Sequence, residues 1–99
     1  MNIPHCIKIS IRLDQVQFDK MKSGHIPKET DDRWFIYYED NWLYFFGSRT
    51  GYLIFKCKIH HDGSKHEIRD FYAERDVQMY GNTDDKRDIV ELRHLIEIH

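Results

Sequence analysis

The sequence predicts an α+β domain, with a mostly antiparallel sheet of four or five strands and an N-terminal and a C-terminal helix. Three observations predict this class. Apolar and polar residues alternate over 7–13, which is the period of a half-buried strand. Ten of the fourteen aromatic residues lie between Trp34 and Phe55, in runs bounded by turn residues. Apolar residues recur at helical spacing near the end of the chain. We expect one domain, spanning residues 1–99.

The first strand leads directly into the first helix. Its inward residues are Ile7, Ile9, Ile11 and Leu13. Asp14 predicts an N-cap for a helix that runs to about Ser23 and stops at Gly24. The polar, proline-containing stretch 25–32 predicts a loop.

The aromatic region predicts three strands, over 33–39, 42–47 and 51–60. Asp40-Asn41 predicts a tight turn between the first two. Asp62-Gly63 predicts a hairpin into a further strand near 65–73. A two-residue Asp62-Gly63 loop, which we favour, places Ile68 opposite Cys57. A three-residue loop would bring Phe71 to that face and turn Ile68 outward, because a one-residue slip exchanges the faces.

The last part of the chain predicts a helix that starts at Thr83 or Asp84, after a short helical turn within 75–80. Acidic residues in its first turn suit the positive end of the helix dipole. The apolar stripe of this helix is formed by Ile89, Leu92, Leu95 and Ile96.

The aromatic hairpin is apolar on both faces, whereas a solvated antiparallel sheet alternates apolar with polar residues. Pairing the two strands through the Asp40-Asn41 turn assigns each side chain to a face. One face carries Trp34, Ile36, Tyr38, Leu43 and Phe45, and the other carries Phe35, Tyr37, Trp42, Tyr44 and Phe46. The commoner solution buries both faces, with one helix on each. Alternatively, the helices share one face, and the other binds a partner, a second copy or a flat ligand. We take the second set as the candidate interaction face.

The connection Gly47-Ser48-Arg49-Thr50-Gly51 is the candidate ligand site. Its glycines, hydroxyls and arginine fork suit a phosphate or carboxylate, and the binding residues would be Ser48, Arg49 and Thr50. The same composition also serves an ordinary strand connection.

Catalytic and metal-binding patterns are weak. Glu39-Asp40 is typical of a solvated turn, as is Asp31-Asp32. His60, His61 and His66 do not converge as zinc requires, and we expect exposed hairpin histidines. Cys57 falls on the core face, where a thiol is inert. Familiar hydrolase, kinase and dinucleotide motifs are absent from the sequence. We expect no catalytic residue, no metal and no cofactor.

Charge and composition bound the partners and the location. The net charge is −2, and the fifteen basic residues are scattered among seventeen acidic ones, which disfavours nucleic acid. We expect neither a signal peptide nor a membrane span, because residues 1–5 lack a basic start and an apolar core and no apolar run approaches about 20 residues. Two cysteines with no metal or redox spacing fit reduced thiols. We expect a cytoplasmic protein without nucleic-acid or membrane binding.

The string from Asp32 to Gly51, D-R-W-F-I-Y-Y-E-D-N-W-L-Y-F-F-G-S-R-T-G, resembles a family of small uncharacterised bacterial proteins. The family pattern is W-F-x-Y-x-E-D-x-W-L-Y-F followed by an R-S-x-T-G loop. The chain departs from it at Gly47, where the family has arginine. Some members occur with ADP-ribose-processing proteins, so the resemblance implies an accessory role linked to a nucleotide.

The sequence thus favours a non-enzymatic interaction or accessory domain that forms a homodimer or binds a protein partner through the aromatic face. The alternative is a domain that binds or processes a phosphate-bearing nucleotide such as ADP-ribose through the 47–51 loop.

Overall fold

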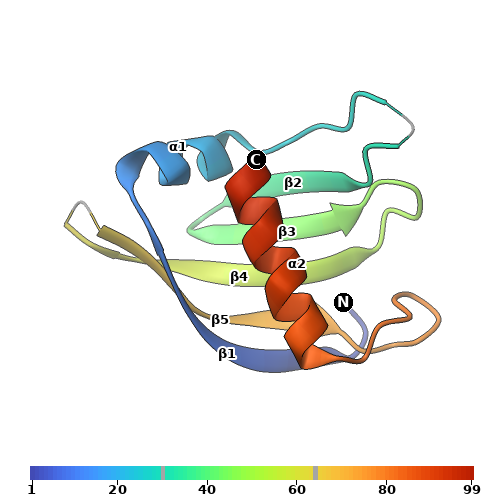
Figure 1. Cartoon of the computed structure of the whole chain (residues 1–99). Coiled ribbons are helices and arrows are strands. Elements are labelled where there is room, and N and C mark those ends of the chain that lie inside the picture. The colour runs from blue at the N-terminus through green and yellow to red at the C-terminus, as the bar shows by residue number, and fades with distance from the viewer. Residues whose placement is uncertain (30, 64) are drawn as a thin grey trace.

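The domain is a five-stranded, wholly antiparallel sheet with two helices (Figure 1). The structure, a computed structural model, describes residues 1–29, 31–63 and 65–99. The predicted fold class is confirmed, with the first helix following the first strand. In chain order the elements are β1 (Pro4–Leu13), α1 (Gln15–Ser23), β2 (Trp34–Glu39), β3 (Trp42–Gly47), β4 (Leu53–Asp62), β5 (Lys65–Glu74) and α2 (Asp85–Ile98).

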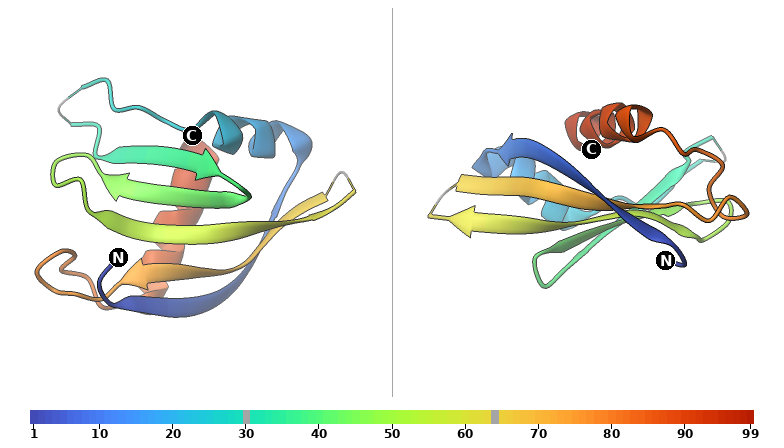
Figure 2. Two further views of the ribbon diagram at one scale, coloured as in Figure 1. Left: turned by 180° about the vertical axis from the view of Figure 1, so that it is seen from behind. Right: turned by 90° about the horizontal axis from the view of Figure 1, so that it is seen from below.

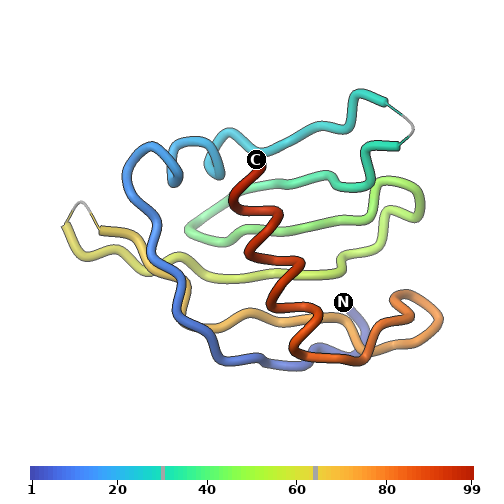
Figure 3. Tube along the Cα trace, viewed as in Figure 1, coloured from blue at the N-terminus to red at the C-terminus, as the bar shows by residue number. Residues whose placement is uncertain are grey.

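The strand order is β1-β5-β4-β3-β2, so the chain starts at one edge, crosses to the other and returns strand by strand. The trace in Figure 3 shows the end of β1 bending across the sheet to α1, and the segment after α1 leading into β2. The β2–β3 turn is as predicted. Asp40 and Asn41 both have positive φ, 51° and 69°, which is the type I′ geometry that matches strand twist.

The predicted register of the β4–β5 hairpin is wrong by two residues. Asp62 pairs with Lys65 and Ile59 with Ile68, so the loop begins at Gly63 and Cys57 does not face Ile68. Residue 64 lies outside the described residues. The register then shifts between Lys56 and Ile59. This irregularity brings both Ile68 and Phe71 onto the core face, although a regular ladder would allow only one of them.

Both helices are capped as the sequence predicts. The Asp14 side chain accepts from the Gln17 backbone N–H at 2.8 Å, and the Gln17 side chain accepts from the Asp14 N–H at 3.1 Å, which completes a capping box. Asp84 caps α2 by accepting from the Lys86 N–H.

The core lies on a single face of the sheet. Phe18 and Met21 of α1 belong to the same buried cluster as Leu92, Leu95 and Ile96 of α2. Phe55 is fully buried at its centre and packs against the rings of Phe45, Phe71, Trp34 and Tyr80. In Figure 2 (right), α2 lies over one side of the sheet, and none of the described helices covers the other. Neither described helix is long and apolar enough to cross a membrane.

Candidate functional site

The hairpin sorts its side chains into the two predicted faces. Phe35 pairs with Phe46, Tyr37 with Tyr44, and Glu39 with Trp42, and directly paired residues share a face. The face predicted for interaction therefore lies opposite the core. The structure adds Lys56 of β4 and Tyr72 of β5 to this face. Lys56 pairs with Tyr44 on one side and with Tyr72 on the other, so all three share a side of the sheet. We call this side the outer face: Phe35, Tyr37, Trp42, Tyr44, Phe46, Lys56 and Tyr72.

The outer face is uncovered because both helices use the other side. Of the two arrangements that the sequence leaves open, the structure adopts the one in which the helices share a face. Every outer-face ring keeps contact with solvent, and Tyr37 is 42% exposed. By contrast, the core-face residues Ile36, Leu43 and Phe45 are at most 2% exposed.

Ring pairs organise the outer face. Phe35 and Phe46 meet edge to face at 5.9 Å between centroids, and Tyr37 and Tyr44 stack at 6.1 Å. The Lys56 ammonium lies 5.7 Å from the Trp42 ring centroid and 5.4 Å from that of Tyr72. Such cation–π contacts hold a lysine against the aromatic surface. The result is an aromatic surface that extends over β2, β3, β4 and β5.

The rim of the outer face carries charges of both signs. Lys58 and Glu39 both pair with Trp42 in the sheet and so share its side. At the β1–β5 edge, the Lys8 ammonium lies 3.2 Å from an Asp70 carboxylate oxygen. The rim therefore favours neither a strongly acidic nor a strongly basic partner.

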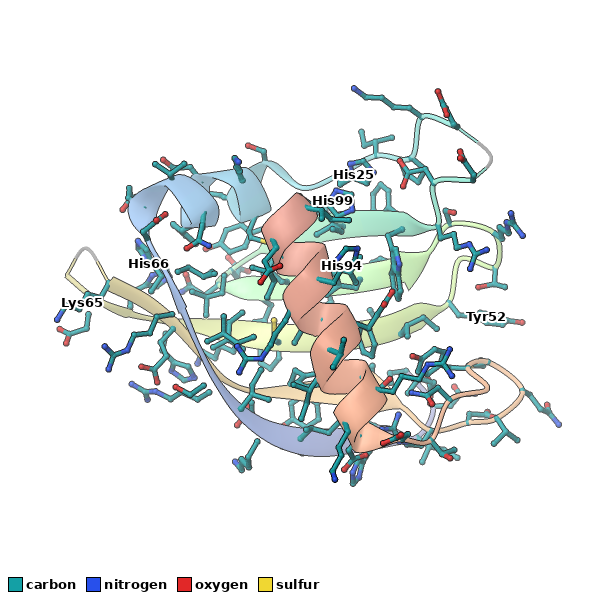
Figure 4. All side chains as sticks on the ribbon, viewed as in Figure 1. His25, Tyr52, Lys65, His66, His94 and His99 are labelled. Carbon is teal, nitrogen blue, oxygen red and sulfur yellow. The ribbon has the colours of Figure 1, made fainter. Side chains whose placement is uncertain are left out.

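The 47–51 loop uses most of its polar groups internally. The Ser48 hydroxyl donates to the Asp32 carbonyl at 2.7 Å, and the Ser48 N–H donates to the Arg33 carbonyl at 2.8 Å. Thr50 Oγ1 accepts from the Tyr52 N–H, and the Gly51 N–H donates to Gly47. These bonds shape the loop rather than presenting donors to a ligand. Figure 4 shows Tyr52, just after the loop, pointing away from the domain.

A hollow of about 380 Å³, the loop pocket, joins this loop to the outer face. It is lined by Pro27, Phe35, Phe46, Gly47, Ser48 and Gly51. A neighbouring hollow of about 440 Å³ is lined by Pro27, Glu29, Ser48 and Arg49. The structure thus places Ser48 beside the rings of Phe35 and Phe46, an adjacency that sequence spacing does not reveal, and Arg49 in the neighbouring hollow. Thr50 lines neither hollow.

The hairpin histidines differ from the prediction, because His66 is buried. Its ring stacks on Phe18 at 4.1 Å, and its Nδ1 lies 2.6 Å from Nδ1 of His61. The Gln15 amide N–H donates to Asp19, which leaves the Gln15 amide oxygen facing His66. That oxygen accepts from Nε2–H of His66 at 3.0 Å. Burial and His66 lower the pKa of His61. The pair joins the β4–β5 hairpin to α1.

A second histidine group lies where α2 ends. Figure 4 shows His25 and His99 close together, with His94 one turn earlier on α2. The His25 and His99 rings are 4.1 Å apart, and His25 Nε2 lies 2.6 Å from an Asp32 carboxylate oxygen. Burial opposes ionisation of Asp32, but His25 holds its pKa below the usual value. Asp32 is therefore not in the fully solvated turn that the sequence predicts, because its side chain is only 21% exposed and is paired with His25.

Metal and nucleophile chemistry find little support. Over residues 1–29, 31–63 and 65–99, no group of three or more His, Cys, Asp or Glu side chains is arranged to hold a metal ion. Cys57 is fully buried, and this burial raises the pKa of its thiol well above the ordinary value.

A buried polar cluster ties the 75–84 connection to α2. Asp88 is fully buried and accepts from the Tyr80 hydroxyl at 2.8 Å and from the Asn82 amide at 2.7 Å. Arg75 bridges Asp88 and Asp85 at 2.6 and 2.8 Å. Burial and Asp88 raise the pKa of Tyr80. In the sequence, Asp88 is one of the acidic residues that suit the start of a helix, and its tertiary partners leave no local pattern.

Comparison with known proteins adds no assignment. No protein-family model matches the chain, and neither the curated proteins nor the solved structures contain a significant match.

Proposed function

We propose that this chain is a small, non-enzymatic interaction domain whose outer face packs against a second copy of the chain. The observation that carries the proposal is the uncovered aromatic surface opposite the helices. Monomers rarely leave large contiguous apolar patches in water. Tyrosine, tryptophan and phenylalanine are also the residues enriched in the centres of protein interfaces.

A second copy fits this face for two reasons. Twisted antiparallel sheets pack face to face about 10 Å apart, and the copy supplies a second sheet of the same twist. A twofold interface also needs a self-complementary surface. The rim meets this condition, since Lys58 and Lys8 are balanced by Glu39 and Asp70.

The outer face indicates the kind of partner, and the cysteines indicate the location. The aromatic outer face suits another protein surface, and the mixed charge of the rim does not favour nucleic acid. We place the protein in the cytoplasm, because Cys6 and Cys57 are both free thiols.

Sedimentation of the full chain tests the dimer. At about 1 mM, where a dimer with a Kd of about 0.1 mM predominates, we expect a mass well above the 12.1 kDa of one chain. Tyr37→Glu and Trp42→Gln, both on the outer face, should return the mass to that of a monomer. Both variants should keep the circular dichroism spectrum of the wild type, because neither residue is part of the buried core.

The matched control is Val90→Glu. Val90 is 68% exposed on α2, away from the outer face, so its variant should sediment like the wild type. A monomeric wild type at about 1 mM would overturn the dimer proposal, since even a weak specific interface is populated there.

A second candidate is a phosphate-bearing nucleotide such as ADP-ribose, bound at the 47–51 loop. The loop pocket favours it, because Phe35 and Phe46 offer a surface for a base beside Ser48. Arg49, in the neighbouring hollow, would supply the positive charge for a phosphate. Titrating the labelled protein with ADP-ribose should then shift the amide resonances of residues 47–51. Unchanged amides at millimolar ligand would rule this candidate out.

A further inference from the structure

A second hollow, on the helix side of the sheet, combines positive charge with an apolar floor. This helix-side pocket measures about 390 Å³, which is within the size range of small-molecule sites. It lies between α2 and the start of β2, the end of β3 and the start of β4, on the side of the sheet that carries the helices and away from the outer face. Its lining residues come from five parts of the chain: Arg33, Trp34, Gly47, Ile54, Tyr80, Arg87 and Glu91.

The two arginines give the pocket its chemistry. Arg33 precedes β2 and Arg87 lies in the first turn of α2, so residues 54 apart in sequence face one hollow. Among the described residues, neither guanidinium makes a side-chain hydrogen bond or an ion pair. Arg75, by contrast, is bonded to Asp85 and Asp88. Two such forks at one hollow are suited to a carboxylate or phosphate group.

The remaining lining defines the rest of the ligand. Ile54 is buried, and the Trp34 ring is stacked on Phe55 at 5.6 Å, so an apolar surface is held rigidly beside the arginines. The Tyr80 hydroxyl is already bonded to Asp88, which leaves Tyr80 to contribute its ring. Glu91 offsets one of the two positive charges.

We propose that the helix-side pocket binds a small oxyanion that carries an apolar ring. Arg33 and Arg87 bind its carboxylate or phosphate group, and Trp34 and Ile54 contact the ring. This site shares no residue with the outer face and only Gly47 with the 47–51 nucleotide candidate, so either of those proposals can fail without affecting it.

Trp34 fluorescence provides the test. In a Trp42→Phe background, which removes the other tryptophan, the full chain is titrated with phenyl phosphate, phenylacetate, inorganic phosphate and benzyl alcohol. We expect saturable changes with the two ring-bearing anions. Inorganic phosphate lacks the ring and benzyl alcohol lacks the charge, so each should bind about tenfold more weakly or not at all. Tighter binding of phenyl phosphate would assign the site to phosphates, and tighter binding of phenylacetate to carboxylates.

Variants show whether the two arginines are responsible. Arg33→Gln and Arg87→Gln should each weaken binding of the preferred anion by about tenfold or more, the effect of losing a charge-assisted hydrogen bond. Lys86→Gln, one residue from Arg87 but outside the pocket, is the control and should bind like the parent. The proposal is overturned if neither ring-bearing anion gives a saturable change at millimolar concentration. It is equally overturned if the two arginine variants bind as tightly as the control.

Discussion

Glu74→Gln is expected to lower the free energy of unfolding by about 2–4 kcal/mol at pH 7, because buried charge-assisted hydrogen bonds are costly to lose. Glu74 is fully buried at the end of β5. Its carboxylate accepts four backbone N–H groups, from Asn2 and Ile3 at 2.8 Å and from Arg75 and Asp76 at 3.1 Å. A glutamine side chain would point its NH₂ group toward at least one of these backbone N–H groups, and two donors cannot bond to each other.

The effect should depend on pH in a defined direction. Burial alone would raise the pKa of Glu74, but the four N–H groups outweigh it and hold the pKa below the ordinary value. A carboxyl group with a lowered pKa in the folded state stabilises above its unfolded pKa, about 4.3, and loses that contribution as the pH falls through the folded value. The difference between wild type and variant should therefore be constant from pH 7 to about pH 5 and shrink in more acidic solution.

Urea unfolding across this pH range measures both effects. Glu97→Gln is the control, since Glu97 is exposed on α2 and its removal should change the unfolding free energy by no more than about 0.5 kcal/mol. A Glu74→Gln protein as stable as this control at pH 7 would show that the four bonds contribute no net stability.

Gly24→Ala is expected to destabilise the fold by about 2–5 kcal/mol, by combining backbone strain with a steric clash. Gly24 has φ of 73° and ψ of −170°, a region that is essentially restricted to glycine. A Cβ atom there would lie 2.5 Å from the Ile36 carbonyl oxygen. That carbonyl accepts from the His25 N–H at 2.9 Å, so relief of the clash must disturb the bridge between the α1–β2 segment and β2.

Gly63→Ala separates the clash from the strain. Gly63 also has positive φ, 62°, but a Cβ added to it meets nothing within 4 Å. Its alanine variant should lose only about 1 kcal/mol, the cost of the left-handed backbone. Equal losses for the two variants would show that the approach of Gly24 to Ile36 is relieved without cost. Hydrogen exchange at the amides of His25 and Ile36 should report the opened bridge directly.

Two candidate sites meet at the end of β3. Gly47 lines both the loop pocket on the outer side and the helix-side pocket on the core side. The outer face and the helix-side pocket nevertheless use different side chains, so substitutions at Tyr37 and Arg87 can test the two proposals separately.

Local pattern was enough to predict most of the elements. The alternation of Ile7 to Leu13 specified β1, and Asp14 and Gly24 marked the ends of α1. The Asp40-Asn41 turn fixed the register of β2 on β3, and the two-residue period of a strand then placed Phe35, Tyr37 and Trp42 on one face. These features depend on neighbours in sequence, which is why one sequence could specify them.

Features that depend on distant residues required the tertiary structure. A shift in the β4–β5 ladder brought Phe71 and Ile68 to the same face, and turn residues carry no information about such a shift. The burial of His66 and Asp88 likewise depends on residues far apart in the chain. So does the placing of Arg33 and Arg87 at one pocket. By itself, the sequence determined that the aromatic hairpin has two apolar faces. Only the packing of both helices on one side decided that the other stays open, because the side a helix covers is set by the path of the whole chain.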